Sequence, residues 1–177
     1  MTRKAADTLV RAATAGDARS IHGLMTRHLA EGHLLPRTLA NIIEHADRFV
    51  VATVRGRTVG CAELAPLSST LAEIRSFVVS SRQRGRGVGR LLVNELRARA
   101  RRRGFEQLCA FTHAPAYFLR LDFSSVSHAS VPEKIAADCH DCPQFGRCGQ
   151  SAVVMEIGPL ADLRPATIAL RATQARL

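Results

Sequence analysis

A glycine-rich stretch in the middle of the chain, residues 82–90, has the composition of a loop that binds phosphate groups. It reads Arg-Gln-Arg-Gly-Arg-Gly-Val-Gly-Arg, follows an apolar segment at residues 74–79, and precedes apolar residues with helical spacing at residues 91–100. Glycines let the backbone approach an anion closely, and the free amides of a first helical turn point toward it. The sequence therefore predicts a strand, a turn and a helix start that hold a polyphosphate, with arginines adding positive charge.

Three of the five cysteines, Cys139, Cys142 and Cys148, are spaced like the start of a metal-binding pattern. Structural zinc normally takes four ligands, often supplied as two close pairs. The chain has one Cys-x-x-Cys pair, so His128 or His140 would have to complete the set. We predict that no metal is required and that these cysteines serve packing; zinc binding and a redox or disulfide role are the alternatives.

The composition suits a globular protein that works in the cytoplasm. The chain has 177 residues, 46% of them hydrophobic, which is enough for one domain with a sizeable core. No apolar run reaches the length of a membrane span, and the start of the chain lacks the hydrophobic segment of a secretion signal. An odd number of cysteines argues against a secreted scaffold built from disulfides alone. Cys61 and Cys109 lie on predicted strands and are expected in the core.

Positive charge dominates the sequence: the formal net charge is +10, and all but two of the 25 basic residues are arginine. Such a surplus is typical of proteins that bind nucleic acid. However, nine arginines fall within residues 82–103, around the predicted phosphate loop and on the helix after it. The chain has one tyrosine and no tryptophan, so it lacks an aromatic platform for stacking bases. We therefore expect neither nucleic acid nor a membrane as partner.

The elements that must position these groups alternate between strands and helices. The order predicts an α/β fold with a mixed sheet, in which an antiparallel meander is followed by a crossover helix and further strands. Asp17 is expected to cap the first helix and Gly104 to end the third. Predicted strands cover residues 8–13, 49–54, 58–64, 71–79, 108–111, 126–131 and 151–157, and predicted helices cover residues 18–30, 38–46, 88–103 and 115–121.

The spacing Arg82-x-x-Gly85-x-Gly87, after a strand that ends at Val79, resembles the signature of the GNAT superfamily of acetyl-CoA-dependent N-acetyltransferases. A Rossmann site is excluded because no βαβ unit opens the chain. A Walker loop is excluded because no Gly-Lys-Ser/Thr is present. The resemblance implies the GNAT fold, a mixed, mostly antiparallel twisted sheet flanked by helices on both faces.

Further segments resemble the short, single-domain N-acetylglutamate synthases, which transfer acetyl from acetyl-CoA to the amino group of glutamate and open arginine biosynthesis. We expect an acetyltransferase domain over residues 1–158 and a C-terminal tail over residues 159–177, which is either a dimer arm or disordered. The matching segments are Leu34-Leu35-Pro36-Arg37, Ala72-Glu73-Ile74-Arg75-Ser76, Tyr117-Phe118-Leu119-Arg120-Leu121, Val131-Pro132-Glu133-Lys134 and residues 138–145.

For the cofactor acetyl-CoA, the resemblance implies two kinds of contact. The loop amides hold the pyrophosphate, and the strand end at Phe77, Val78 and Val79 hydrogen-bonds the pantetheine while it splays from the neighbouring strand. Splayed backbone groups need partners, which the cofactor's amides supply. The alternative is a surface turn with solvated arginines. The loop residues assigned to the cofactor are Arg84, Gly85, Arg86, Gly87, Val88, Gly89 and Arg90.

Glu73 is the expected general base. The α-amino group of an amino acid is mostly protonated near neutral pH, and a nearby carboxylate can remove that proton directly or through a water. The segment Ala72-Glu73-Ile74 resembles the one that carries the catalytic glutamate in N-acetylglutamate synthases. The alternatives are an exposed strand glutamate paired with an arginine of the neighbouring strand and, for the base itself, His113.

The proton donor for the leaving thiolate stays unassigned. Related enzymes often place a tyrosine five residues before the aromatic of a Gly-Phe pair. Here that position is Phe118, five residues before Phe123, and Asp122 replaces the glycine. Tyr117 is adjacent, but neighbouring side chains on a helix point about 100° apart. Water can protonate the thiolate instead.

Two carboxylates on the acceptor require fixed positive charge, and arginine can bind a carboxylate bidentately. In the family, an arginine after Leu-Pro grips the acceptor and matches Arg37; the alternative is a surface arginine. Longer synthases carry a second arginine where this chain has Gly149 and Gln150, and its loss would loosen selectivity toward glutamine or another amino acid. The other expected substrate contacts are Leu35, Ser76, Thr112 and Ser151, and the candidates for the second carboxylate are Arg75, Lys134 and Arg147.

The sequence thus predicts an enzyme that acetylates L-glutamate by direct attack of the amine on the thioester, with acetyl-CoA and glutamate as its small-molecule partners. One alternative keeps acetyl-CoA and changes the acceptor to another amino acid, a peptide N-terminus or a small amine. The other alternative is a non-catalytic module that binds acetyl-CoA or nucleic acid. A homodimer is compatible with all of these.

Overall fold

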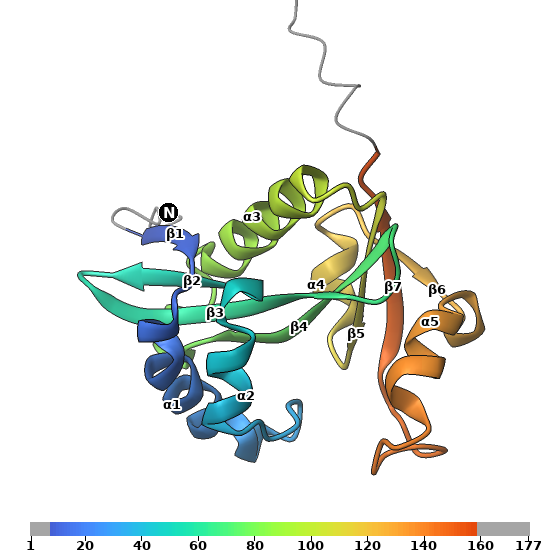
Figure 1. Cartoon of the computed structure of the whole chain (residues 1–177), viewed down its shortest axis with the longest axis horizontal. Helices are drawn as coiled ribbons and strands as arrows, with labels where there is room; N and C mark the ends of the chain where they lie inside the picture. Colours follow the sequence, from blue (N-terminus) through green and yellow to red (C-terminus); the bar gives the residue numbers. More distant parts are fainter. Residues whose placement is uncertain (1–7, 159–177) are drawn as a thin grey trace, which may run out of the picture.

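Three consecutive apolar segments form an antiparallel meander at the centre of the structure: β2 (Phe49–Val54), β3 (Arg57–Pro66) and β4 (Leu71–Val79). Most residues of β2 and β3 are buried, because helices cover the sheet on either side (Figure 1). Such strands show long apolar runs rather than alternation of apolar and polar residues.

Four further strands extend the meander on both sides. β1 (Thr8–Ala12) pairs with β2, and β5 (Gln107–Thr112), β7 (Ser151–Glu156) and β6 (Ser124–Val126) continue the sheet beyond β4. The strand order is β1-β2-β3-β4-β5-β7-β6, and neighbours are antiparallel except for the parallel pair β4 and β5. This mixed, mostly antiparallel sheet confirms the predicted fold class.

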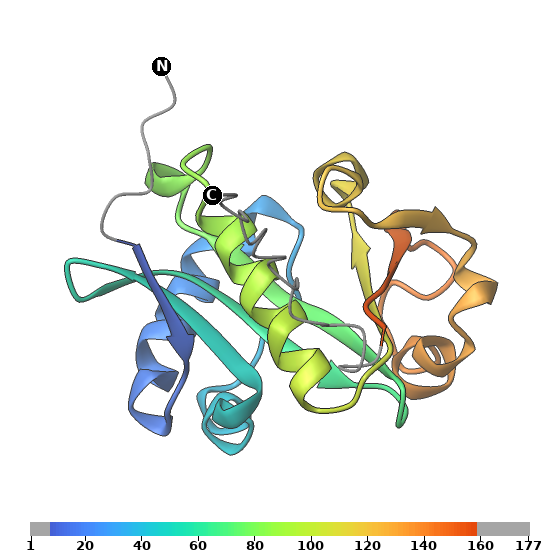
Figure 2. The same ribbon diagram turned by 90° about the horizontal axis from the view of Figure 1, so that it is seen from above.

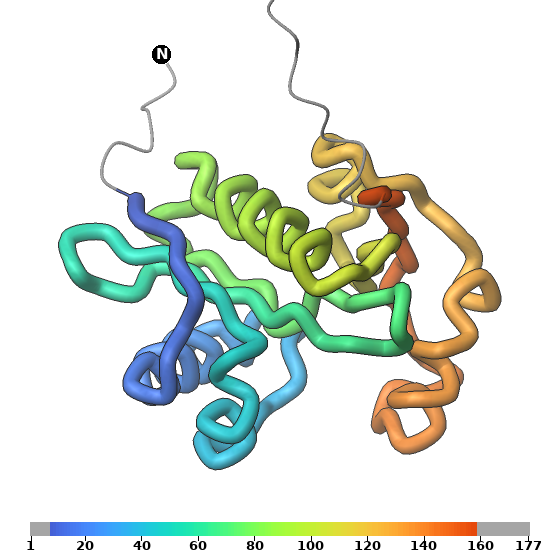
Figure 3. Tube along the Cα trace, turned by 45° about the horizontal axis from the view of Figure 1, so that its top comes forward, coloured from blue at the N-terminus to red at the C-terminus, as the bar shows by residue number. Residues whose placement is uncertain are grey.

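Helices pack on both faces of the sheet, as Figures 1 and 3 show. One face carries α3 (Val88–Arg102) together with the short α4 (Pro115–Leu119). The other face carries α1 (Ala18–His28) and α2 (Leu39–Glu44). The side chain of Thr38 caps α2 by accepting a hydrogen bond from the third helical amide at 3.2 Å.

The helical spacing of apolar residues places one face of each long helix in a core cluster. Leu92 and Leu96 of α3 are fully buried against the sheet, as are Ile21 and Leu24 of α1 on the opposite face. Burying each such side chain contributes about 1.5–3 kcal/mol to folding. The two clusters fix the helices on either side of β3 and β4, from which the candidate site is built.

β4 and β5 pair over only three residues and then diverge. The parallel ladder joins Leu71 to Gln107, Ala72 to Leu108 and Glu73 to Cys109, and residues 74–79 of β4 have no partner on β5. Figure 2 shows the two halves of the sheet separating from this junction. The structure therefore contains the splay that the resemblance implied.

A bulge in β4 lies just beyond this junction. Glu63 of β3 pairs with Arg75, whereas Cys61 pairs with Val78, so Ser76 and Phe77 share one position of β3. The backbone of Ser76 has φ +49°, an angle that residues other than glycine rarely adopt. This conformation costs on the order of 1 kcal/mol or more. The bulge turns β4 at the point where its backbone leaves β5.

The strand predicted over residues 126–131 is wrong in position. The strand that forms is β6 (Ser124–Val126), and a 3-10 turn over His128–Ser130 follows it. The reason is local: the hydroxyl of Ser127 accepts a hydrogen bond from the amide of Ala129, so the backbone turns instead of extending. The segment after it was expected to be a loop, but forms the helical turns α5 (Pro132–Lys134) and Ile135–Cys139.

The computed structural model describes residues 8–158. The expected tail, residues 159–177, lies outside the described residues. Among those that are described, no helix combines the length and the apolar character needed to cross a membrane.

Candidate active site

An open cleft of about 1720 Å³ begins where β4 and β5 diverge. Its walls are the segment between α1 and α2, the C-terminal half of β4, the glycine-rich loop, the end of β5, and residues 134–150. Of the residues that the sequence analysis assigned to catalysis, cofactor and substrate, including the candidates for the second carboxylate, all but Arg86, Arg147 and Ser151 line this cleft. Segments far apart in the sequence are thus brought to one place.

The glycine-rich loop enters α3 through left-handed turns. Gly85 and Gly87 have φ of +73° and +85°, conformations in which any other residue would be strained. Among the described residues, the backbone amides of residues 85–90 donate no hydrogen bond to a backbone acceptor. These amides and the positive end of the helix dipole are therefore available to an anion.

Gly89, in the first turn of α3, packs directly against Tyr117 of α4. A Cβ atom at Gly89 would lie 2.3 Å from Oη of Tyr117 and 3.1 Å from Cζ of Phe77. That hydroxyl is buried without a hydrogen-bond partner in the part of the chain that the structure describes, and burial raises the pKa of Tyr117. Phe118, which occupies the position usual for tyrosine, is buried beside Phe123, with ring centroids 5.2 Å apart.

Arg84 lines the cleft and forms an ion pair with Glu31. Its Nη2 contacts both carboxylate oxygens of Glu31, at 2.9 and 2.7 Å, and its Nε donates to the carbonyl of Val79 at 3.0 Å. The hydrogen bond from Arg84 lowers the pKa of Glu31. The ion pair therefore ties the end of the α1 region to the phosphate loop. Arg90 lines the cleft, whereas Arg86 lies outside it.

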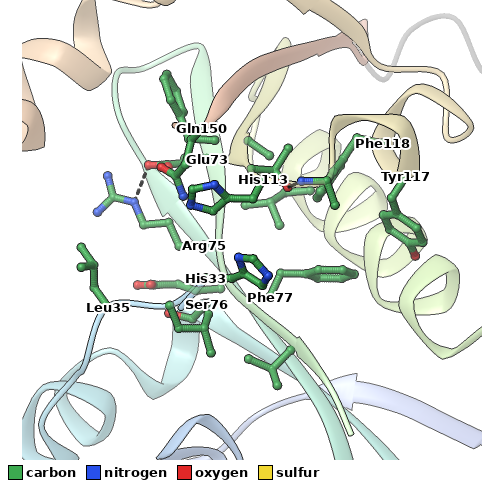
Figure 4. A pocket seen from close by; sticks show the side chains of 18 of the residues that line it. His33, Leu35, Glu73, Arg75, Ser76, Phe77, His113, Tyr117, Phe118 and Gln150 are labelled. Atoms are coloured by element: carbon green, nitrogen blue, oxygen red, sulfur yellow. Dashed lines mark hydrogen bonds and ion pairs between the residues drawn. The ribbon is translucent and has the colours of Figure 1, made fainter. Parts of the chain in front are cut away.

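Glu73, the last β4 residue that pairs with β5, is buried at the junction, with a side chain only 4% exposed. Arg75, two residues further along β4, donates Nε to its carboxylate (Figure 4). Nζ of Lys134 lies 2.9 Å from the same group. Both cations also contact Asp138, Lys134 at 3.0 Å. The structure thus contradicts the alternative of an exposed glutamate paired with the neighbouring strand, because Glu73 is buried and its arginine lies on β4 itself.

Electrostatics within this network are balanced, with two cations facing two carboxylates. Burial by itself lowers the pKa of Arg75, but the nearby carboxylates of Glu73 and Asp138 outweigh burial and raise it. Pairing offsets the cost of removing these charges from water. The network therefore holds a carboxylate in a fixed position at the floor of the cleft.

Arg37 enters the cleft from the segment between α1 and α2. Its Nε and Nη2 donate to Oδ1 of Asn41, the former at 2.9 Å, and its Nη1 donates to Glu63 and to Oγ of Ser76, the latter at 3.2 Å. Its guanidinium lies 5.5 Å from the ring centroid of Phe49. The side chain is 19% exposed, so the alternative of an ordinary surface arginine is wrong.

Of the remaining predicted substrate contacts, Leu35 and Thr112 line the cleft and Ser151 does not. Leu35 lines the cleft with 56% of its surface exposed. Thr112 also lines it, and its Oγ1 accepts a hydrogen bond from the amide of Ala114 at 3.0 Å. Ser151 pairs with Thr112 across β5 and β7 but does not reach the cleft. His113 meets His33 across the cleft, with ring centroids 5.1 Å apart (Figure 4).

Several cleft residues that contact the predicted ones were not identified from the sequence, among them Glu63, Asn41, Asp138 and His33. Glu63 had a usable signal, because it is a single charged residue inside an apolar strand and is only 1% exposed in the structure. A lone buried charge requires a partner of opposite sign. Asn41, Asp138 and His33 lie in segments where polar residues are ordinary, so no local pattern marks them.

The cysteines fall into two groups. Cys61 and Cys109 are buried, as predicted, and burial raises the pKa of each thiol to about 12. The other three, Cys139, Cys142 and Cys148, line the cleft and are at least partly accessible. Within residues 8–158, no three His, Cys, Asp or Glu side chains are arranged to hold a metal ion.

The candidate metal ligands outside the cysteines have other contacts. Nε2 of His128 lies 2.8 Å from the carbonyl of Gln150, and its ring packs against Phe111. The ring of His140 packs against Phe145, with centroids 5.7 Å apart. Both imidazoles thus take part in packing next to the cleft.

Residues 18–123 of the chain match the family model "Acetyltransferase (GNAT) family". The chain belongs to the GNAT acetyltransferase family. An uncharacterized N-acetyltransferase from Chlorobaculum tepidum is 37% identical over 150 residues, which cover 85% of this GNAT chain and 97% of the relative. An amino-acid acetyltransferase from Mycobacterium tuberculosis is 29% identical over 130 residues, 72% of this chain and 74% of that one.

A solved structure shares the fold of this GNAT chain. It is N-acetylglutamate synthase from Neisseria gonorrhoeae, complexed with coenzyme A and N-acetyl-glutamate, and the match has a TM-score of 0.77 with 24% identity. The match covers 87% of this chain and 36% of the synthase, so this GNAT chain corresponds to about a third of that protein's length. The fold class and family expected from the sequence are thereby confirmed.

Proposed function

We propose that this GNAT acetyltransferase is an amino-acid N-acetyltransferase that moves the acetyl group of acetyl-CoA to the α-amino group of L-glutamate. The observation that carries the proposal is that one cleft joins the phosphate loop, the diverging strands and the buried carboxylate of Glu73. The names of the relatives, amino-acid acetyltransferase and N-acetylglutamate synthase, support an amino-acid acceptor. Formation of N-acetylglutamate would place the enzyme at the start of arginine biosynthesis.

The cleft has the features that a coenzyme A thioester needs. The amides of residues 85–90 and the side chains of Arg84 and Arg90 suit its pyrophosphate, and the absence of a side chain at Gly89 lets Tyr117 pack against the first turn of α3 beside them. The backbone of residues 77–79, which β5 does not cover, suits the amides of the pantetheine arm. When bound, acetyl-CoA supplies an acetyl thioester that an amine can attack.

Glu73 is the group proposed to take the proton from the acceptor's amine. Its two cationic contacts fix the carboxylate at the floor of the cleft, and proton transfer requires a base within hydrogen-bond reach of the amine. The hydroxyl of Tyr117 lies at the loop end of the cleft and has no partner among the described residues. Because this oxygen is buried against Gly89, we assign it no proton transfer, and the thiolate's proton can come from water.

Positive charge on the acceptor side comes from Arg37, Arg75 and Lys134, which all line the cleft. These cations suit the carboxylates of an amino acid and disfavour polyamines. Arg147, a further candidate for the second carboxylate, does not line the cleft. We therefore propose that the acceptor lies in the part of the cleft bounded by β4, α5 and the segment between α1 and α2.

The experiment that tests this function measures thiol release from acetyl-CoA with a panel of amines. We expect release with L-glutamate, and the product should be N-acetylglutamate by mass spectrometry. The panel includes L-glutamine, other amino acids, a peptide with a free N-terminus and a polyamine. Release with the peptide or the polyamine alone would contradict an amino-acid acceptor, and release with none would contradict an acetyltransferase acting on small amines.

A further inference from the structure

We infer that Arg75, rather than Arg37, holds the α-carboxylate of the acceptor. The site would then select free α-amino acids over amines that lack this carboxylate. The inference rests on the proposed function, because it takes Glu73 as the group that meets the acceptor's amine. It also reverses the role that the resemblance suggested for Arg37.

The hydrogen-bond donors of Arg37 are almost fully used by the protein. A guanidinium has five N–H groups, and four of them donate to Asn41, Glu63 and Ser76. The fifth, on Nη2, donates to no residue among those that the structure describes. A carboxylate bound bidentately needs two N–H groups, so it would have to displace Asn41 or Ser76. Arg37 is therefore poorly placed to grip an acceptor.

Most N–H donors of Arg75, in contrast, are not used by the described residues. Nε donates to Glu73 and Nη2 donates to Asp138, and these are its hydrogen bonds within residues 8–158. Both N–H groups of Nη1 and one of Nη2 are left, which is enough for a carboxylate. The side chain lines the cleft, is 27% exposed, and lies in Figure 4 on the side of the pocket where Leu35 is found.

The pairing of Glu73 with Arg75 also matches the shape of an amino acid. In a free amino acid, one carbon atom separates the α-ammonium group from the α-carboxylate. Glu73 and Arg75 stand two residues apart on one face of β4 with their charged groups in contact. An acceptor whose amine approaches Glu73 therefore brings its α-carboxylate next to Arg75.

Charge balance points the same way. The network of Glu73, Arg75, Lys134 and Asp138 is neutral as a whole, and the α-ammonium and α-carboxylate of an amino acid together add no net charge to it. The side-chain carboxylate of glutamate is not part of this balance. An amine without the carboxylate would add one positive charge and leave the donors of Arg75 without a partner. Unpaired charges in a partly buried site are costly, so such amines are disfavoured.

Arg37 then acts as a positioning residue. Through Glu63 and Ser76 it fastens the segment between α1 and α2 to the bulge of β4, and Glu63 is almost fully buried beneath it. Its loss would disturb the cleft wall as a whole. It would not remove a contact specific to one group of the acceptor.

The test compares two acceptors that differ only in the α-carboxylate: L-glutamate and its α-amide. The measured quantity is the ratio of kcat/KM for the two acceptors, in the wild type and in each variant. A general loss of activity lowers kcat/KM for both acceptors equally and cancels in this ratio. The ratio therefore still measures recognition of the α-carboxylate in a partly impaired variant. Calorimetric titration with CoA checks that each variant is folded.

We expect the wild type to prefer glutamate at least tenfold, the scale of one charge-assisted hydrogen bond. Arg75→Gln should bring the ratio close to one, and Arg75→Lys should leave it in between. Arg37→Gln, the matched control, should lower kcat/KM for both acceptors and keep the ratio.

The outcomes separate this inference from the proposed function. An unchanged ratio in Arg75→Gln, a ratio lost in Arg37→Gln, or equal use of both acceptors by the wild type overturns the role of Arg75 and leaves the proposed function standing. Absence of thiol release by the wild type with every amino acid overturns the proposed function, and the inference falls with it.

Discussion

Nζ of Lys134 lies 2.9 Å from the carboxylate of Glu73, although 61 residues separate them in the chain. This contact connects α5, at the far wall of the cleft, to the base of the splay between β4 and β5. Glu73 is thereby held from two sides, since Arg75 binds it from its own strand. A carboxylate fixed in this way suits proton transfer, because its position is set before the acceptor binds.

Replacing Glu73 with glutamine should lower kcat about 10²-fold or more near neutral pH, the usual scale for loss of a general base. The amide keeps the size of the side chain but cannot take up the amine's proton. The assay is steady-state thiol release at saturating acetyl-CoA and acceptor. CoA affinity, measured by calorimetry, should stay unchanged, and a kcat near that of the wild type would remove Glu73 from this role.

Replacing Lys134 with methionine should lower the free energy of unfolding by about 1–3 kcal/mol, because Glu73 and Asp138 then share a single cation. Urea unfolding measures the change. The double variant Glu73→Gln/Lys134→Met should lose less than the sum of the two single losses, since the contact is counted only once. Strict additivity would mean that the ion pair does not stabilise the fold.

Replacing Gly89 with alanine should weaken CoA binding about tenfold. Alanine normally favours a helix over glycine by up to about 1 kcal/mol, but here its Cβ atom would lie 2.3 Å from Oη of Tyr117. The ring of Tyr117 would have to move into the cleft. Calorimetric titration with CoA measures the effect.

The matched control for Gly89→Ala is a second change at Tyr117. Tyr117→Phe removes the oxygen that makes the shortest contact, so the double variant Gly89→Ala/Tyr117→Phe should recover most of the CoA affinity. If affinity is not recovered, the clash with the hydroxyl is not the cause of the loss. The two contacts that remain, 3.1 Å to Cζ of Phe77 and 3.2 Å to Cζ of the ring at position 117, would then be the cause.

Thiol reactivity should divide the five cysteines into two groups. In the folded protein at pH 8, a thiol reagent should modify three cysteines and should reach all five only after unfolding. Cys61 and Cys109 are protected because burial raises the pKa of each to about 12 and shields it from the reagent. Cys148→Ser should lower the native count to two. Fewer than three native thiols in the wild type would favour the disulfide alternative for the cysteine segment.

The parts of the fold that the sequence predicted correctly are those with local signals. The glycines at positions 85 and 87 mark left-handed turns before a helix, and the apolar spacing of α3 marks its buried face. The strand predicted over residues 126–131 was misplaced, because Ser127 starts a turn through its own side chain and the apolar residues around it resemble a strand. Local chemistry thus decided a boundary that composition did not.

The candidate site was predictable only in part, for a physical reason. The sequence indicated Glu73 and Arg37 through their neighbouring residues, but their partners come from other elements: Lys134 for the first and Glu63 for the second. Contacts between distant segments depend on the bulge at Ser76 and on where α5 packs. Short-range patterns do not encode either of these, so the donor use that distinguishes Arg37 from Arg75 appears only in three dimensions.

Asp17 provides a test of pH-dependent stability away from the cleft. The hydrogen bond from Arg11 lowers the pKa of this carboxyl to about 2, and the amide of Thr14 adds a further hydrogen bond at 2.8 Å. A lowered pKa contributes stability that is present above about pH 4 and is lost as the pH falls through about 2. Asp17→Asn should therefore reduce the free energy of unfolding by about 1 kcal/mol near pH 7. The difference from the wild type should shrink between pH 4 and pH 2.

Arg11→Gln, which removes the main cause of the lowered pKa of Asp17, should show the same trend when denaturation is measured across this pH range. A difference in unfolding free energy that stays constant down to pH 2 would contradict the assignment.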